Sequence, residues 1–133
     1  MRLKTFVCAV ALTHLTSSSA FALPPSDTPN LDRSRARAEQ FFKNLGLHEA
    51  VIHDIYIAGY FYAVNNACGD ITTTQAAANI SDANYGTFAR PMGMSRKDWD
   101  IYVDLMQKQL TSTLVTFASE RTVFCEEYIG KKK

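Results

Sequence analysis

The chain has 133 residues, of which 47% are hydrophobic and 20% are charged, and its 14 Lys and Arg nearly balance its 13 Asp and Glu. This composition excludes a disordered tail, a collagen-like or repeat polymer and a multidomain enzyme. It predicts one small globular domain.

The first 22 residues have the pattern of a secretory signal peptide. Arg2 and Lys4 give a positive start, an apolar segment follows, and Ala20-Phe21-Ala22 places small residues where signal peptidase requires them. The apolar segment, about 11 residues long, falls short of the roughly 20 that a membrane span needs. We therefore expect a cleaved leader over residues 1–22, no membrane span after processing, and an exported protein that is periplasmic or secreted.

Removal of the leader changes the charge of the chain. The mature protein from Leu23 to Lys133 loses two basic residues, so its acidic residues outnumber its basic ones by one. Three of the remaining positive charges form the terminal run 131–133, which leaves an acidic body. Binding to nucleic acid relies on clustered Lys and Arg, and we expect no nucleic-acid partner.

Two cysteines, Cys68 and Cys125, remain once Cys8 leaves with the leader. An even pair in an exported chain is expected to form a disulfide. The loop that it closes would restrict the unfolded chain by about 4 kcal/mol. The alternative is that Cys68 is a reactive nucleophile.

The first helix is expected after a proline-rich lead-in. Residues 23–30 contain three prolines and are predicted to be extended. From Asp32 to Leu45 apolar residues recur at helical spacing, with Asp32 as the cap and Gly46 as the stop. This pattern predicts a helix with one apolar side.

The second helix is expected over 48–68, where few positions are polar. A helix that is apolar nearly all round belongs at the centre of a bundle. Gly59, in its middle, costs about 1 kcal/mol relative to Ala, which indicates that a neighbouring helix approaches closely there.

A third helix is expected to start at Thr72, Thr73 or Thr74, and 87–94 is expected to be a loop that separates it from a fourth. Ser95, with Asp98 three residues on, nearly matches a capping box. Apolar residues then recur at helical spacing as far as Phe117: Trp99, Val103, Met106, Leu110, Leu114 and Phe117.

The fourth helix is expected to continue to Gly130, with a bend at Glu120-Arg121. The disulfide would tie its end to the end of the second helix. The sequence thus predicts an all-α fold, an approximately four-helix bundle that forms a single domain over residues 31–133.

No residue pattern predicts a catalytic, cofactor or metal site. His48 and His53 lie five positions apart, about 140° around a helix, whereas a helical zinc motif needs two histidines four apart. Ser81 and Ser95 do not lie in the Gly-x-Ser-x-Gly motif of a nucleophilic serine. Glu126 and Glu127 are adjacent, so on a helix their side chains would point about 100° apart and need not share one site.

The segment 85–94 contains an aromatic pair, an arginine and two methionines beside Gly and Pro. Such residues are enriched at protein contact sites, so Tyr85, Phe88, Arg90 and Met92 are the candidate partner contacts. The alternative is that Phe88 and the methionines fill the core between the third and fourth helices.

With its leader, its helical mature chain, Cys68 ending a central helix, and Cys125-Glu126-Glu127-Tyr128 near the terminus, the chain resembles the amidase immunity proteins of type VI secretion systems. These are exported, helical and disulfide-bonded, with a Cys-x-x-Tyr near the end. The resemblance covers the layout from Cys68 to Tyr128.

This resemblance implies a non-enzymatic binding protein of the bacterial envelope that inhibits a secreted cell-wall enzyme by occupying its site. The acidic body would suit a basic protein partner. Two alternatives stay open: a structural or accessory subunit of an envelope assembly, and a small hydrolase with an unrecognised site.

Overall fold

The computed structural model describes residues 26–69 and 74–132, and the side chains within 26–69 and 74–127. These ranges form α-helices and two short helical turns, without a strand: α2 (Pro29–Asn44), α3 (Glu49–Ala67), α4 (Thr74–Asn84), η1 (Tyr85–Ala89), η2 (Arg90–Met92), α5 (Arg96–Thr116) and α6 (Ala118–Lys132). The predicted all-α fold is confirmed. The expected leader, residues 23–25 and the candidate caps Thr72 and Thr73 lie outside the described residues.

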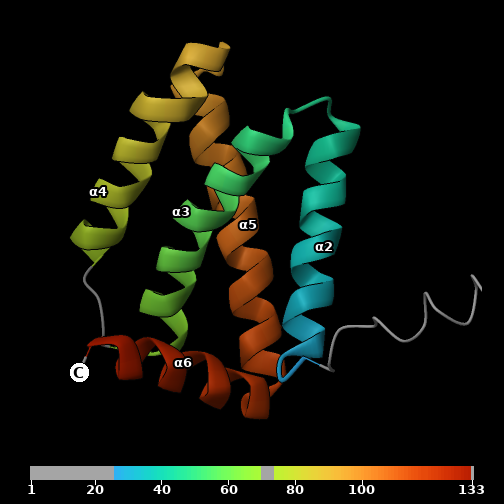
Figure 1. Cartoon of the computed structure of the whole chain (residues 1–133), viewed down its shortest axis with the longest axis vertical. Helices are drawn as coiled ribbons and strands as arrows, with labels where there is room; N and C mark the ends of the chain where they lie inside the picture. The colour runs from blue at the N-terminus through green and yellow to red at the C-terminus, as the bar shows by residue number, and fades with distance from the viewer. Residues whose placement is uncertain (1–25, 70–73, 133) are drawn as a thin grey trace, which may run out of the picture.

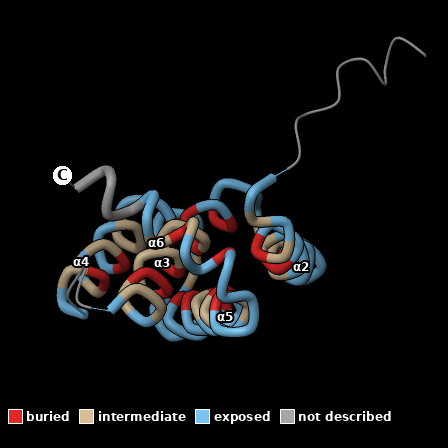
Figure 2. Tube along the Cα trace, turned by 90° about the horizontal axis from the view of Figure 1, so that it is seen from below, coloured by how far each residue is buried: buried red, intermediate tan, exposed pale blue. Residues whose placement is uncertain are grey.

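Helix α3 occupies the centre of the bundle (Figure 1). Helices α2 and α4 lie on either side of it, α5 lies behind it, and α6 crosses the lower end. The buried positions of the surrounding helices turn toward α3 (Figure 2). The largest fully buried side chains are Trp99, Phe42, Ile55, Met106, Leu110, Leu114 and Val64. The predicted central position of the second helix, α3, is therefore confirmed.

Helix α2 starts earlier than the sequence pattern predicts. It begins at Pro29, inside the segment expected to be extended, and its cap position is Thr28 rather than Asp32. Proline is tolerated here because the first N–H groups of a helix have no intrahelical partner. The helix ends before Gly46, whose φ of 85° is the left-handed conformation expected of a stop.

The N-terminus of α2 is completed by a side chain from the far end of the chain. The carboxylate of Glu120, in α6, accepts hydrogen bonds from the backbone N–H of Leu31 at 2.9 Å and from Asn30 Nδ2 at 2.6 Å. Glu120 is only 4% exposed. A carboxylate at this position satisfies a free backbone donor and complements the helix dipole.

The predicted fourth helix is two helices. Ser95 caps α5 as expected, since its Oγ accepts the backbone N–H of Asp98 at 3.1 Å. The helix breaks at Phe117, where φ is −111° and ψ is 83°, and not at Glu120-Arg121. The predicted apolar residues of this helix are buried from Trp99 to Leu114, whereas Phe117 is 39% exposed. The change of direction lets α6 cross the ends of α2 and α3.

A disulfide joins Cys68, at the end of α3, to Cys125, in α6, with Cα atoms 5.5 Å apart. The predicted pairing is present. Together with Glu120, it fixes α6 to both α2 and α3. Over the residues described, no helix has the length and apolar character required to cross a membrane.

Candidate protein-contact site

The connection between α4 and α5 is helical rather than a loop. A π-helical turn, Tyr85–Ala89, continues directly from α4, and a 3-10 turn, Arg90–Met92, follows it. Pro91 fits because it lies in the first turn of its short helix. Gly93, with φ of 87°, ends the turn. Single π-helical turns are frequent at functional sites.

The two large hydrophobic residues of this connection point to solvent. Phe88 is 47% exposed and Met92 is 52% exposed, and Arg90 is exposed beside them. The interpretation of Phe88 and Met92 as core residues is therefore wrong. Met94 does pack against the core, where it is half-buried. We call the surface formed by Phe88, Arg90 and Met92 the tip.

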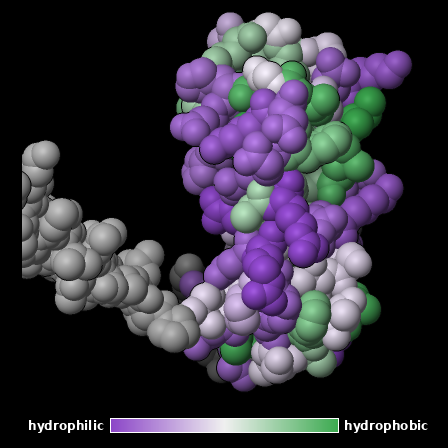
Figure 3. Space-filling model, turned by 90° about the vertical axis from the view of Figure 1, so that its right-hand side faces the viewer, coloured by the Kyte–Doolittle hydropathy of each residue, from purple (hydrophilic) through white to green (hydrophobic). Residues whose placement is uncertain are grey.

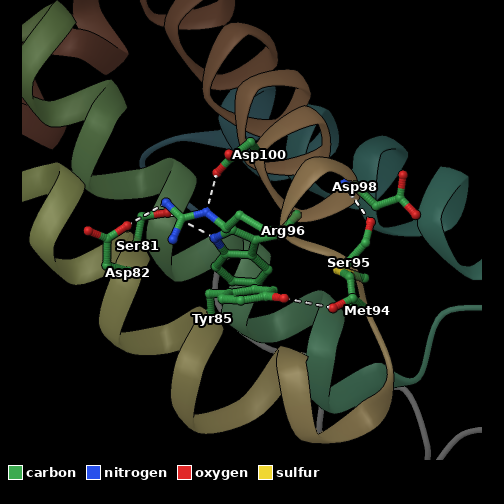
Figure 4. Close-up of polar contacts among 9 residues, drawn as sticks. Ser81, Asp82, Tyr85, Met94, Ser95, Arg96, Asp98 and Asp100 are labelled. Carbon is green, nitrogen blue, oxygen red and sulfur yellow. Dashed lines mark hydrogen bonds and ion pairs between the residues drawn. The ribbon is translucent and has the colours of Figure 1, made fainter.

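Tyr85 supports the tip from beneath. It is half-buried, and its hydroxyl donates a hydrogen bond to the carbonyl of Met94 at 3.0 Å (Figure 4). Its ring centroid lies 6.0 Å from that of Trp99. The bond joins the two ends of the connection. Of the four predicted contact residues, Tyr85 thus has a structural role, and the other three are available at the surface.

Arg96 joins the two helices that carry the tip. Its guanidinium donates to Asp82 of α4 and, through Nε at 2.9 Å, to Asp100 of α5 (Figure 4). It also lies over the Tyr85 ring, 5.4 Å from the centroid. The hydrogen bonds, first to Asp82 and then to Asp100, raise the pKa of Arg96. Sequence reasoning did not single out Arg96, although its spacing to Asp100 is that of a helical ion pair.

Trp99 anchors α4 to α5 in the core. It is fully buried, and its Nε1–H donates to Ser81 Oγ at 3.0 Å. Ser81 is itself 3% exposed. The hydroxyl of Ser81 therefore serves as the acceptor that the buried indole needs.

A polar cleft of about 420 Å³ lies between α3, α4 and α5. Its two carboxylates are paired, Asp100 with Arg96 and Asp104 with Lys108. Hydrogen bonds, first from Lys108 and then from Gln107, lower the pKa of Asp104. Burial, followed by the nearby Asp82 and Asp100, raises the pKa of the Tyr62 hydroxyl at the same cleft.

A second cleft, of about 440 Å³, lies between α2, α3 and α6 and has aromatic walls. The guanidinium of Arg35 lies 3.5 Å from the centroid of the Tyr56 ring and pairs with Glu39. Burial raises the pKa of Tyr56, and Arg35 opposes this effect. Tyr60 and Phe124 stack edge to face at 5.0 Å, which closes the inner wall.

The histidines and acids of α3 do not converge on a metal site. His48 caps this helix, with its Nδ1 accepting the backbone N–H of Ala50 at 3.1 Å. His53 is exposed, and neighbouring Asp54 is buried. Within residues 26–69 and 74–127, no group of three or more His, Cys, Asp or Glu side chains is placed to hold a metal ion. Glu126 and Glu127 are both exposed on α6.

Comparison of the chain with protein-family models finds no matching family. Comparisons with curated proteins and with solved structures likewise find no match.

Proposed function

We propose that this chain is an exported, non-catalytic binding protein of the bacterial envelope, and that it inhibits a secreted cell-wall enzyme by placing the tip in that enzyme's active-site cleft. The single observation that carries the proposal is the exposure of Phe88 and Met92 on a supported helical turn. Phe, Met and Arg are enriched at the cores of protein interfaces relative to the rest of the surface.

The support beneath the tip favours binding. Tyr85, Arg96 and Trp99 hold the connection to both helices through hydrogen bonds and ring contacts. A contact surface that is already ordered loses little conformational entropy when it binds. The resemblance to the type VI amidase immunity proteins, based on the spacing of Cys68 and Cys125 and on the terminal tetrapeptide, supplies the kind of partner.

The proposal is tested by capture from bacterial cells that express the full chain with a C-terminal tag. We compare the wild type with the double variant Phe88→Ala/Met92→Ala. The control is Val115→Ala, which removes an equally apolar side chain, 65% exposed, from α5. Far-UV circular dichroism checks that all three proteins are folded.

We expect wild type and control to retain a cell-wall enzyme. The double variant should bind it about thirtyfold more weakly or worse, which corresponds to the removal of two contact residues worth about 1 kcal/mol each or more. Addition of one equivalent of the wild type should inhibit that enzyme. Equal capture by all three proteins, or capture of no enzyme, would overturn the proposal. Retention of a multi-protein assembly instead would support the accessory-subunit alternative, and hydrolysis of cell-wall fragments by the chain itself would support the hydrolase alternative.

A further inference from the structure

The polar cleft between α3, α4 and α5 has the size of a small-molecule site. Its volume of about 420 Å³ lies within the range of about 300 to 1,000 Å³ that such sites occupy. Figure 3 shows the α2 side of the molecule, where hydrophobic residues gather along one edge of the view. The polar cleft lies on the other side of α3, because α4 and not α2 supplies its third wall.

Two hydroxyl groups that line the polar cleft have no acceptor among the described residues. Ser81 accepts the Nε1–H of Trp99 at 3.0 Å, but its own O–H donates to none of these residues. Since Ser81 is only 3% exposed, a partner for this donor has to come from the cleft. Tyr62 is half-buried, and its hydroxyl has no described hydrogen-bond partner either. Burial, followed by Asp82 and Asp100, raises the pKa of Tyr62, so its hydroxyl stays protonated and is a donor.

The polar cleft also offers acceptors. Asp100 uses Oδ1 to accept the Nε–H of Arg96 (Figure 4), and its Oδ2 has no partner in the described part of the chain. Asn66 donates through Nδ2 to Gln107 Oε1 at 2.9 Å, which leaves Asn66 Oδ1 as an acceptor. Val103, which is 4% exposed, adds a small apolar wall. The cleft thus combines unpaired donors, unpaired acceptors and an apolar contact.

The charges around the polar cleft do not favour an anion. Among the described residues that line it, none is Lys, Arg or His. Arg96 pairs with Asp82 and Asp100, and Lys108 pairs with Asp104. Three carboxylates and two bases leave one negative charge in this region. A phosphate or carboxylate ligand would therefore be repelled.

We infer that the polar cleft binds the ring of a neutral sugar. Each hydroxyl of a sugar both donates and accepts hydrogen bonds, which matches a cleft that has unpaired groups of both kinds. An amine has donors only and an anion has acceptors only, so each would leave one set unpaired. The C–H groups of a sugar ring can pack against Val103 and the ring of Tyr62. The cleft contains no residue of the tip, so this inference does not rest on the proposed inhibition.

Titration of the nitrogen-labelled, disulfide-bonded protein with glucose and with N-acetylglucosamine, followed by NMR, tests the inference. Trp99 is the single tryptophan of the chain, and its indole N–H is bonded to Ser81 at the edge of the cleft. This N–H therefore gives one resolved signal close to the site. We expect at least one of the two sugars to shift this signal saturably, with a Kd of about 0.1 to 10 mM, the affinity of a small ligand held by a few hydrogen bonds.

Tyr62→Phe should weaken sugar binding about threefold to tenfold, because it removes one hydroxyl donor and keeps the ring. Tyr102→Phe is the matched control. Tyr102 is a half-buried tyrosine of α5 that packs against Phe42 outside the cleft, and its variant should bind as the wild type does. Circular dichroism confirms the fold of each variant. The tip variant Phe88→Ala/Met92→Ala should also bind sugar normally, so the sugar site and the proposed inhibition can fail independently.

Two charged probes distinguish a sugar site from a site for a charged ligand. N-acetylglucosamine 6-phosphate should bind more weakly than the neutral sugar because of its negative charge, and putrescine, a diamine without hydroxyls, should not displace the sugar. The absence of a saturable shift with both sugars up to about 50 mM would overturn the inference. So would unchanged affinity in Tyr62→Phe, tighter binding of the phosphorylated sugar, or displacement of the sugar by putrescine.

Discussion

A Cβ atom placed on Gly59 of α3 would lie 2.6 Å from Cγ of Met106 in α5. It would also lie 2.9 Å from Met106 Cβ and 3.2 Å from the backbone nitrogen of Gln107. These atoms are close to the backbone of α5 and cannot move aside without moving the helix. The absence of a side chain at Gly59 is therefore what lets the two central helices approach, as the sequence predicts.

Gly59→Ala should destabilise the protein despite its better helix propensity. Alanine gains about 1 kcal/mol in propensity, but overpacking of a close helix pair costs about 1 to 3 kcal/mol. A contact of 2.6 Å places this site in the upper half of that range, so we expect a net loss of about 1 to 2 kcal/mol. Urea denaturation measures it. Gly86→Ala is the control, since its Cβ would lie 3.9 Å from Arg90 Nη2, an ordinary van der Waals contact. Wild-type stability of Gly59→Ala would contradict the close approach.

Glu120→Ala should lower the free energy of unfolding by about 2 to 3 kcal/mol. It removes both hydrogen bonds at the N-terminus of α2 and leaves the Leu31 N–H without its acceptor. Glu120→Gln should lose less, because its carbonyl can still accept the Leu31 N–H. Chemical denaturation compares both with Glu126→Ala, an exposed change on the same helix that should have little effect. Equal stability of the two alanine variants would show that Glu120 is not required.

Cys68→Ser/Cys125→Ser should reduce stability by about 4 kcal/mol, because the bridge closes a loop with a sequence separation of 57. Urea titration of the oxidised wild type and the double variant measures the difference. Reduction of the wild type should bring its midpoint to that of the variant. Thiol titration of the unreduced, denatured protein should find neither of these cysteines free; a free pair would remove the bridge as a source of stability.

Ser81→Ala should cost about 1 to 3 kcal/mol, because it leaves the buried Trp99 N–H without an acceptor. Trp99 is the single tryptophan of the chain, so its fluorescence reports directly on this site during unfolding. The same substitution in a Trp99→Phe background should cost little. A similar cost in both backgrounds would mean that Ser81 acts through packing and not through the hydrogen bond.

Asp54→Asn should stabilise the protein at neutral pH. Burial raises the pKa of Asp54, and the adjacent His53 only partly opposes this effect. The folded state thus holds the proton more tightly than the unfolded state, so the carboxyl group's contribution to stability is lost as pH rises through its folded pKa. The melting temperature of the variant should exceed that of the wild type at pH 7, and the gap should narrow at pH 4. A gap that is constant with pH would exclude ionisation of Asp54 as its cause.

Local patterns predicted the features of the fold that depend on near neighbours in sequence. The Ser95 cap needs only the N–H of Asp98, three residues away, and the stop at Gly46 needs only a permissive backbone. The apolar spacing from Trp99 to Leu114 likewise follows from helical geometry. The disulfide was predictable because Cys68 and Cys125 were the two cysteines left after the expected leader.

Other features, which depend on side-chain partners distant in the sequence, were not predictable. The sequence predicted only a bend at Glu120. Its role as a cap was missed because its hydrogen-bond partners, Asn30 and Leu31, lie at the other end of the domain. No Gly or Pro marks the break at Phe117, which continues the apolar spacing of α5. At the candidate site, Gly86 and Pro91 predicted a loop. The structure has a helical connection there instead, with hydrogen bonds donated by Tyr85 and Arg96.

The bond between Glu120 and Leu31 has a consequence for the order of folding. Its two residues are separated by 89 positions, so the first described helix cannot acquire its final capping partner until the last has been synthesised. The three helices between them can pack earlier, through contacts that are nearer in sequence. A chain shortened before residue 118 would therefore keep the packing of α3 against α5 but leave the N-terminus of α2 without its capping carboxylate. In the full chain, the docking of α2 should be the last folding step to complete.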